Sequence, residues 1–582
     1  MDYAFFKAVE QAKTLIADSA RKEFGKNVEN AVVAPARDPG QADLASPICF
    51  SLAKELGKNP AELAKELAEE INKQLVKTAA GHLERAEAAN GYVNFFFSQK
   101  FFDDSVGQAV TAGEGFGSWT FGKGRKIVVD FSSPNVGKPM HIGHIRSTIL
   151  GDSVRKLLQK CGFNVVGENY LCEAGNQVAT LMLGIQEFGP EKLKDDKDLL
   201  DYYVRISQKV EGDEELKKKA LEIVHKMENG DKSIAGQLKK VRDISLPPLY
   251  RNYLALGVEF ESEVFDSEVV ELGKKMVAEA VEKGAAFKDE TGGEIVGNLE
   301  EKTKLPNLVI LRSNGTTLYS TRDLGLAEER WQKYKFDAAI YVTASEQNTH
   351  FRQVFKLLEL MGREYAAKME HIGFGLIFLE GGQKLSSRKG QVLLLEDVLA
   401  EAVEKAGKEI GREGYSDEER KTIAEQVGIA AVKFAVLRVT SQKDIHFSPE
   451  KSVSFQGDTG AYVQYTFVRS RKILEKAAEE GKEKAGKANG NYSYLPEERL
   501  VAKTVAEFPA VVKNAAEARQ PNQVCDYLLR LCAAFSTFYN NCPVLKAETA
   551  EGREKRLELV RAVNATLGEG LKLLGMRTPA KM

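Results

Sequence analysis

The fold is decided by residues 127–144, which read IVVDFSSPNVGKPMHIGH. The first five letters are almost wholly apolar and have the length of a buried strand. A loop rich in proline and glycine follows, and a helical period then runs from His141 to Cys161. Because residues 164–166 start another strand pattern, the order strand, loop, helix, strand predicts a βαβ unit and a parallel sheet.

Two histidines, His141 and His144, stand where this helix begins. A helix amino end offers unpaired N–H groups and a positive dipole, so imidazoles there can donate hydrogen bonds to the oxygens of a displaced pyrophosphate. Lys138 adds a cation, and Gly143 leaves room for a flat base against the backbone. Such histidines can also be helix caps or chance metal ligands. The βαβ context favours a phosphate site, since ligands bind at the carboxyl ends of parallel strands.

The tetrapeptide 141–144, His-Ile-Gly-His, matches the signature of class I aminoacyl-tRNA synthetases, and residues 131–139 before it resemble the arginyl enzymes of that class. Gly137 stands where those enzymes usually have alanine. The resemblance covers nearly the whole chain. It implies an α/β Rossmann-type catalytic domain that activates L-arginine with ATP, releases pyrophosphate and transfers arginine to the terminal ribose of tRNA(Arg).

A second basic loop, residues 381–390, reads GGQKLSSRKG. Its glycines, cations and hydroxyls suit the binding of a triphosphate, although basic loops often only face solvent. It resembles the second signature loop of class I synthetases. The resemblance assigns catalytic roles in this loop to Lys384, Ser386, Arg388 and Lys389. Ser387 replaces the family's second lysine, so we expect Lys138 to take over that role, and whether Arg388 or Lys389 shares it stays open.

A substrate guanidinium needs carboxylates that accept paired hydrogen bonds. An expected hairpin turn at 314–315 is followed by an expected strand at 316–320. Tyr319 lies in that strand and Asp323 comes just after it. The two residues resemble the guanidinium-binding pair of the arginyl family. Taken alone, Asp323 would be explained better as a helix N-cap. The other residues expected to contact arginine are Asp130, Ser132, Asn135, His141 and Gln347. The residues expected to contact ATP are Lys138, His141, Gly143, His144, Phe374 and Lys384.

One stretch departs from the family pattern. Residues 170–177 read YLCEAGNQ, where relatives usually carry Gly-Asp-Trp-Gly before the glutamine. Cys172 and Ala174 replace glycine and tryptophan, so we expect different packing beside the adenosine and assign no site residue here.

Tyr462, Tyr465 and Arg469 recur at a spacing that places them on one face of a predicted helix. Aromatic rings beside a cation suit unpaired bases and phosphates. The same spacing would make a core stripe, and from the sequence alone that alternative is slightly favoured. The resemblance places these positions, and Met582, at the tRNA anticodon. In the N-terminal region it assigns tRNA contacts to Asn90, Tyr92 and Asn94.

A chain of 582 residues is too long for one hydrophobic core, so several domains are expected. A glycine-rich stretch at 113–124 marks one boundary, and a charge-dense stretch at 191–231 indicates a helical insertion. The expected domains are an α+β tRNA-binding domain at 1–112, the Rossmann domain at 120–400 with its insertion at about 190–300, a helical stem-contact region at 401–460, and an all-α anticodon-binding bundle at 461–582.

The formal net charge of −2 hides a basic carboxyl end, because residues 461–582 carry 20 Lys and Arg against 14 Asp and Glu. That asymmetry suits a polyanionic ligand. The six cysteines are scattered without a Cys-x-x-Cys pair, which argues against disulfides and a zinc site. No apolar run reaches the roughly 20 residues of a membrane span, and no signal peptide pattern opens the chain. We expect a cytoplasmic monomer with no resident metal, and Mg²⁺ accompanying ATP.

Two rival interpretations stay open at this point. Another class I synthetase, such as the cysteinyl kind, would need a set of zinc-binding cysteines that the sequence lacks. A catalytically inactive relative that only binds tRNA is disfavoured because His141, His144, Lys138 and Asp323 are all in place.

Overall fold

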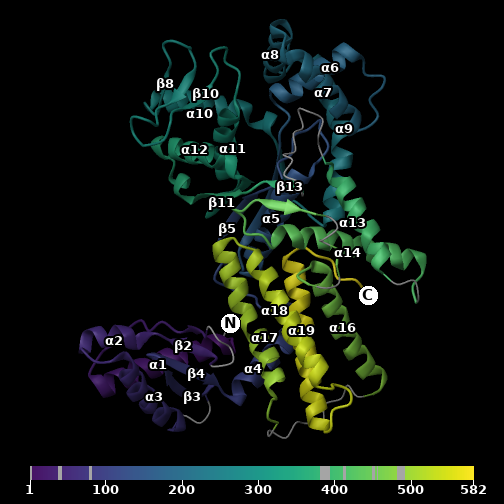
Figure 1. The fold of residues 1–582 in the computed structure, drawn as a ribbon. Helices are drawn as coiled ribbons and strands as arrows, with labels where there is room; N and C mark the ends of the chain where they lie inside the picture. Colours follow the sequence, from purple (N-terminus) through teal and green to yellow (C-terminus); the bar gives the residue numbers. More distant parts are fainter. Residues whose placement is uncertain are drawn as a thin grey trace. The chain divides into compact units, whose positions relative to one another are not determined.

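The computed structural model describes residues 3–36, 42–77, 81–379, 393–410, 414–448, 453–454, 457–481 and 492–582. The chain forms two compact units (Figure 1). Unit 1 comprises Met1–Ser118, Thr466–Val512 and Tyr527–Gly570, and unit 2 comprises Trp119–Tyr465, Lys513–Asp526 and Leu571–Met582. Each unit is therefore assembled from segments that lie far apart in the sequence.

Unit 2 is built on a five-stranded parallel sheet with the order β12-β11-β5-β6-β7. Its strands are Lys126–Asp130 (β5), Asn164–Leu171 (β6), Ser262–Phe265 (β7), Ala338–Ala344 (β11) and Met369–Phe374 (β12). β5 is central and is buried from residue 127 onward, as strands covered on both faces are. The strand order reverses between β5 and β11, and ligands of open α/β sheets bind at such a switch point. The predicted parallel sheet is confirmed.

Helix α5 (Ile142–Lys160) follows β5 and is buried along most of its length. Helices α10 (Val270–Glu282), α11 (Tyr319–Tyr334) and α12 (Asn348–Leu360) share a core cluster with the small antiparallel sheet β10-β9-β8. The strands of this sheet are Ala286–Lys288 (β8), Ile295–Gly297 (β9) and Leu308–Leu311 (β10).

The strand expected at 316–320 is wrong, because helix α11 already begins at Tyr319. The hydroxyl of Thr321 accepts a hydrogen bond from the backbone N–H of Leu318 at 2.9 Å. This side chain satisfies an N–H group that has no partner within the helix, and so it starts the helix directly after the turn at 314–315.

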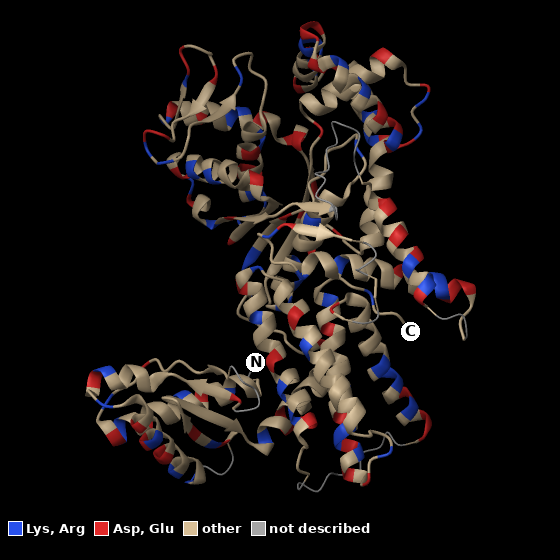
Figure 2. Ribbon diagram, viewed as in Figure 1, with Lys and Arg blue, Asp and Glu red and all other residues tan. Residues whose placement is uncertain are grey.

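The charge-dense segment is helical. It forms α7 (Asp196–Glu211), α8 (Glu214–Glu228) and α9 (Lys232–Leu256), which pack with α6 (Asn176–Phe188) around a shared apolar cluster. Aspartates cap the amino ends of α7, α8 and α9, where a negative side chain is favoured. Figure 2 shows charges of both signs interspersed along these helices, the pattern of solvated outer faces.

Four further elements belong to unit 2. Strands β13 (Ile377–Leu379) and β14 (Ile445–Phe447) pair in parallel, and helices α13 (Leu395–Glu409) and α14 (Asp417–Leu437) pack against each other.

Unit 1 contains an antiparallel sheet with the order β1-β2-β4-β3. The strands are Ala34–Pro35 (β1), Leu44–Ser46 (β2), Leu83–Ala89 (β3) and Tyr92–Phe97 (β4), accompanied by helices Ala4–Phe24 (α1), Ile48–Leu56 (α2), Pro60–Lys77 (α3) and Gln99–Ala112 (α4). Unit 1 also holds most of Gly460–Glu479 (α16), Pro496–Ala518 (α17), Asn522–Asn541 (α18) and Ala550–Leu573 (α19). The predicted combination of α+β and all-α parts with the α/β sheet is confirmed.

Within the described ranges, no helix is long and apolar enough to cross a membrane, and no cluster of three or more His, Cys, Asp or Glu side chains could hold a metal. All six cysteines are unpaired, and only Cys172 is more than slightly exposed. This confirms that the cysteines form no disulfides.

Candidate active site

The first turn of α5 is closed by its two histidines. His141 is the N-cap residue, and its Nδ1 accepts a hydrogen bond from the N–H of Gly143 at 3.1 Å. The Nδ1 of His144 accepts from the N–H of His141, also at 3.1 Å. The ring centroids lie 3.9 Å apart. Because Nδ1 accepts in both rings, a neutral ring carries its proton on Nε2 and can donate from that atom.

Both imidazoles are kept uncharged by their surroundings. Burial, aided by the charge of Lys138, lowers the pKa of His141 to about 4. Burial also holds the pKa of His144 well below its ordinary value, and His141 and Lys138 add to the effect. The pair therefore offers neutral hydrogen-bond donors at pH 7, at a helix end that already attracts anions. Capping and phosphate binding are thus compatible roles for the same two rings.

Two glycines in this motif fill specific needs. A Cβ on Gly143 would lie 2.8 Å from Cε1 of His141, so any side chain there would displace that ring. Gly137 adopts a φ of +84°, a left-handed conformation that alanine adopts at a cost. An alanine at this position would also place its Cβ 2.5 Å from Cδ2 of Leu181. The Lys138 ammonium lies 3.8 Å from the ring centroid of Tyr203 on α7.

The loop after β5 holds Ser132 and Asn135 in different ways. Ser132 is buried, with a φ of +74°; its N–H donates to the hydroxyl of Ser147, and its own hydroxyl lies 2.8 Å from those of Thr148 and Tyr253. Both of its polar groups are thus engaged within the protein. Asn135 is half-buried and its backbone pairs with that of Cys172. The loops after β5 and β6 therefore join through this residue.

Asp130, the predicted second carboxylate, lies at the carboxyl end of β5 but has partners of its own. It pairs with Arg330 of α11 at 2.8 Å and accepts a hydrogen bond from Ser133. Arg330 also binds the buried Glu168 at 2.5 Å. Burial raises the pKa of Asp130, and Arg330 works against that rise. A substrate guanidinium would have to compete with Arg330 for this carboxylate.

Asp323 lies in the second turn of α11, whose N-cap residue is Leu318, so the helix-cap alternative is wrong. Its side chain is 12% exposed and its Oδ2 lies 2.6 Å from Nε2 of His350. Tyr319, one turn earlier, is 55% exposed and its ring lies 4.9 Å from the Arg322 guanidinium. Gln347 is exposed in a short turn that follows β11. Of the two predicted carboxylates, Asp130 and Asp323, Asp323 is thus the more exposed, and polar side chains lie beside it.

The sequence did not reveal His350 as a site residue, although it lies three residues after Gln347. It stands in the first turn of α12, and its partner Asp323 is 27 residues away. Burial lowers the pKa of His350, but the hydrogen bond and charge of Asp323 outweigh burial and raise it overall. The signal available in the sequence was a histidine three residues after Gln347, which was itself assigned to the arginine site.

Lys384, Ser386, Arg388 and Lys389 lie outside the described residues. Phe374 is the last residue of β12, is buried, and pairs with Ala344 at the carboxyl end of β11. It lies at the same edge of the sheet as the loop that follows β5.

The three residues predicted to meet the anticodon share α16. Tyr465 is 38% exposed, whereas Tyr462 and Arg469 are half-buried. The Arg469 guanidinium lies 3.7 Å from the ring centroid of Tyr539 in unit 1. A fully buried core stripe, the favoured alternative, is therefore wrong for Tyr465. Met582 is partly exposed.

At the other end of the sequence, Asn90 occupies the turn between β3 and β4 with a φ of +49°. Tyr92 is 37% exposed and its ring lies against Phe50, and Asn94 is half-buried. All three lie on or next to one antiparallel strand.

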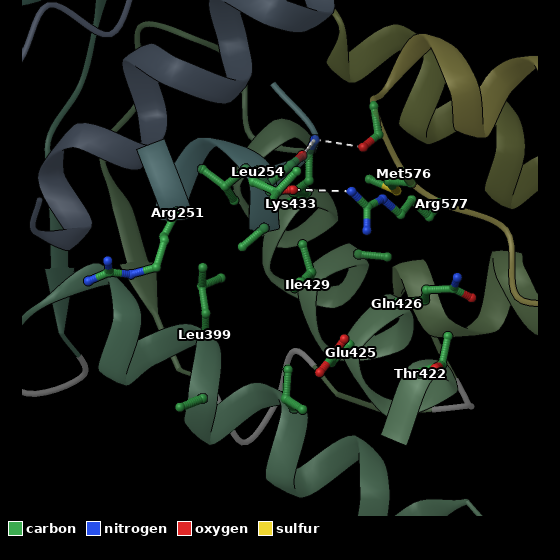
Figure 3. A pocket seen from close by; sticks show the side chains of 16 residues that line it. Arg251, Leu254, Leu399, Thr422, Glu425, Gln426, Ile429, Lys433, Met576 and Arg577 are labelled. Carbon is green, nitrogen blue, oxygen red and sulfur yellow. Dashed lines mark hydrogen bonds between the residues drawn. The ribbon is translucent and has the colours of Figure 1, made fainter. Parts of the chain in front are cut away.

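A cavity of about 560 Å³ lies elsewhere in unit 2, among α9, α13, α14 and residues 575–577 (Figure 3). Its lining is mostly apolar, with Leu256, Leu399 and Ile429 among its residues. It contains none of the residues predicted to bind ATP or arginine, so it is distinct from the site at the sheet.

Comparison with protein families gives three matches that together span most of the chain. Residues 108–448 match the catalytic domain of "tRNA synthetases class I (R)", residues 463–582 the "DALR anticodon binding domain", and residues 10–97 the "Arginyl tRNA synthetase N terminal domain".

Similar proteins agree over nearly the full length. An arginine–tRNA ligase of Halothermothrix orenii is 35% identical over 98% of this chain and 99% of its own, and arginine–tRNA ligase 1 of Bacillus cereus is 36% identical over 98% and 100%. Among solved structures, the arginyl-tRNA synthetase of Thermus thermophilus aligns with a TM-score of 0.77 and 26% identity over 98% of this chain and 100% of that one. The Plasmodium falciparum enzyme aligns with a TM-score of 0.79 at 22% identity, covering 99% of both, which shows the shared fold.

Proposed function

The chain belongs to the class I arginyl-tRNA synthetases, and from that premise we propose that both steps of arginine ligation take place at the carboxyl edge of its parallel sheet. In the first step the arginine carboxylate attacks the α-phosphate of ATP and pyrophosphate leaves. In the second the terminal ribose of the tRNA takes the arginyl group and AMP leaves. The observation that carries the proposal is the neutral histidine pair in the first turn of α5, directly after the central strand β5.

His141 and His144 donate hydrogen bonds to the triphosphate, and these bonds strengthen as negative charge builds on the departing pyrophosphate. Their low pKa values support this role, because a neutral ring whose Nδ1 is occupied has its proton on Nε2. Lys138 supplies a fixed positive charge in the same loop. No covalent intermediate is involved, so positioning and charge stabilisation provide the rate enhancement.

Arginine is bound through its guanidinium by Asp323, with Tyr319 and Gln347 as neutral partners. The exposure of Tyr319 and Gln347 and the partial exposure of Asp323 support this assignment. Asn135 and Ser132 are proposed at the α-amino end of the substrate, and Asp130 is proposed as a second carboxylate of the arginine site. For Ser132 and Asp130 the contact is indirect, since their polar groups already bind other residues.

Lys384, Ser386, Arg388 and Lys389 are proposed to close over the phosphates, and Phe374 and Gly143 to lie beside the adenosine. Mg²⁺ enters with ATP as part of the substrate, because phosphate oxygens are its preferred ligands. We propose further that the enzyme acts as a cytoplasmic monomer, and that tRNA(Arg) contacts Asn90, Tyr92 and Asn94 as well as Tyr462, Tyr465, Arg469 and Met582.

ATP–pyrophosphate exchange with each amino acid in turn, with and without tRNA, tests the function. Exchange with arginine alone among the amino acids is expected, whether or not it requires tRNA. Exchange with another amino acid would contradict the assignment of the substrate. Absence of exchange with all of them, under conditions where tRNA is bound, would favour the inactive tRNA-binding relative.

A further inference from the structure

Lys433 is a buried lysine near the carboxyl end of α14. Its side chain is fully shielded from solvent, and its ammonium donates to the carbonyl of Leu256 at 2.8 Å and to that of Gly575 at 2.6 Å (Figure 3). Leu256 ends α9, and Gly575 follows the end of α19. Carbonyl groups at helix ends lack partners within the helix and carry the negative end of its dipole. One ammonium therefore satisfies the ends of two helices.

Helix α5 also lies against Gly575. Asp152 is fully buried and pairs with Lys156 at 2.5 Å and with Arg155 at 3.0 Å. The next residue, Ser153, donates its hydroxyl hydrogen to the carbonyl of Leu573 at 2.9 Å. Residues 573–577, which we name the tail, thus lie directly on the middle of α5.

The close approach depends on Gly575. A Cβ at this position would lie 2.6 Å from Nζ of Lys433, 2.8 Å from Oδ2 of Asp152 and 2.9 Å from Nζ of Lys156. Its φ of +65° also favours glycine. The tail backbone at residue 575 therefore lies directly against the polar ends of Lys433, Asp152 and Lys156, with no side chain between them.

The cavity of Figure 3 borders the tail, because Gly575, Met576 and Arg577 line it. Empty space on that side cannot hold the tail by packing. Hydrogen bonds take that role: Arg577 donates to the carbonyl of Leu254 at 3.1 Å, and Lys433 donates to Gly575 as above. On the cavity side the tail is thus held by polar contacts, while the buried apolar side chains of Leu573, Leu574 and Met576 also hold it.

The tail is also held by α16. Gln464 is fully buried, and its amide donates to the carbonyl of Arg577 at 2.6 Å and to that of Gln426 at 3.3 Å. Gln464 stands between Tyr462 and Tyr465 in the sequence. The tail therefore contacts both the helix proposed to meet the anticodon and the helix that begins with His141.

We propose that Lys433 is a positioning residue for arginine activation, which holds the tail against α5 and thereby fixes the helix turn that carries His141 and His144. Asp152 lies about 12 Å along the axis from His144 at 1.5 Å per residue, within one continuous buried helix. A displaced tail would shift that helix as a rigid element. Because Gln464 binds the same tail, tRNA bound beside it would act on activation through that tail. The inference rests on the proposed function.

The chemistry of Lys433 makes a clean test possible. Burial lowers its pKa to about 7; Asp152 opposes this, and Lys156 and Arg577 reinforce it. Replacing Lys433 by an apolar side chain of similar length keeps most of the volume but leaves the carbonyls of Leu256 and Gly575 without this donor, which costs stability. Lys433→Met removes both hydrogen bonds while keeping the volume. Lys421→Met is the matched control, because Lys421 is an exposed lysine of the same helix.

The experiment measures kcat and KM in ATP–pyrophosphate exchange, with and without tRNA, together with the melting temperature of each variant. Lys433→Met should lower kcat at least tenfold, leave KM for ATP within about threefold, and melt at a lower temperature than the wild type, so exchange is measured well below that temperature. Lys421→Met should match the wild type throughout. Gln464→Ala should lower the stimulation of exchange by tRNA, and the double variant with Lys433→Met should lose less than the product of the two single losses.

An unchanged kcat in Lys433→Met, whatever the melting temperature, would overturn the inference. If that variant fails to fold, Ser153→Ala provides the decision, because it removes only the hydrogen bond to Leu573. A kcat equal to the wild type in folded Ser153→Ala would equally overturn it. A wild-type enzyme that shows no exchange with arginine would refute the proposed function itself, so the two failures are distinguishable.

Discussion

Replacing Asp323 by asparagine should weaken arginine binding selectively. The side chain is 12% exposed, and its carboxylate has His350 as a hydrogen-bond partner at 2.6 Å. An amide keeps the shape but turns a charged acceptor into a neutral group that also carries donors. Loss of a charged partner at a shielded site costs roughly 2–5 kcal/mol. KM for arginine should therefore rise at least tenfold in ATP–pyrophosphate exchange, while KM for ATP stays near the wild-type value.

The same pair predicts how arginine binding depends on pH. Because Asp323 raises the pKa of His350 above its ordinary 6.5, the ring is protonated at pH 6 and competes with the substrate cation for the carboxylate. As the pH rises through that pKa, the ring loses its charge and the competition ends. KM for arginine should fall between pH 6 and pH 8 in the wild type. His350→Gln should remove most of this fall, because glutamine carries no charge at either pH.

His371 is a further titratable group that interacts with His350. Burial lowers its pKa to about 4, and His350 adds to that effect, so His371 stays neutral across the range tested. It therefore cannot produce the predicted change. A wild-type KM for arginine that is flat from pH 6 to pH 8, or an Asp323→Asn variant with normal arginine affinity, would refute the reasoning.

Three further changes are predicted from the geometry. His144→Ala should reduce kcat by about 10²–10³ with little effect on KM for ATP, as expected for a donor that acts in the transition state; a change confined to KM would contradict this role. Gly143→Ala should also reduce kcat, because its Cβ would lie 2.8 Å from the His141 ring, and an unaltered kcat would show that the ring is free to move. Tyr465→Ala should cost roughly 1–3 kcal/mol of tRNA affinity with little change in melting temperature. Replacing the buried Tyr527 by alanine should instead lower the free energy of unfolding by about 3–5 kcal/mol, and with it the melting temperature. Titration with tRNA and thermal melts distinguish the two variants.

The sheet and the turn that carries the two histidines could be predicted because their signals are local. The apolar run of β5, the loop and the helix that begins with His141 follow one another within some twenty residues. Their order fixes both the parallel sheet and the edge at which ligands bind. The error at 316–320 has a local cause as well. An Asn-Gly turn usually joins two strands, but Thr321 starts a helix here.

The partners of the site residues could not be predicted, because they come from distant parts of the chain. Asp130 at the end of a strand looked like an acceptor for substrate, but Arg330, 200 positions later, neutralises it. Ser132 is held by Tyr253 of α9. Such pairs become visible only when the fold brings the elements together. Residue type and local pattern therefore identified the edge of the sheet better than they identified which of its polar groups face the substrate.

The hydrogen bond between Ser153 and Leu573 joins residues 420 positions apart in the sequence. The segments of unit 1 at 466–512 and 527–570 lie between them along the chain. Unit 2 therefore cannot complete its structure until the polypeptide of the intervening helices has been made. Contacts between residues so far apart in sequence slow folding, because a long loop must close before they can form. During synthesis the parallel sheet would form first. Residues 573–577 would be among the last parts of that unit to pack, against α5.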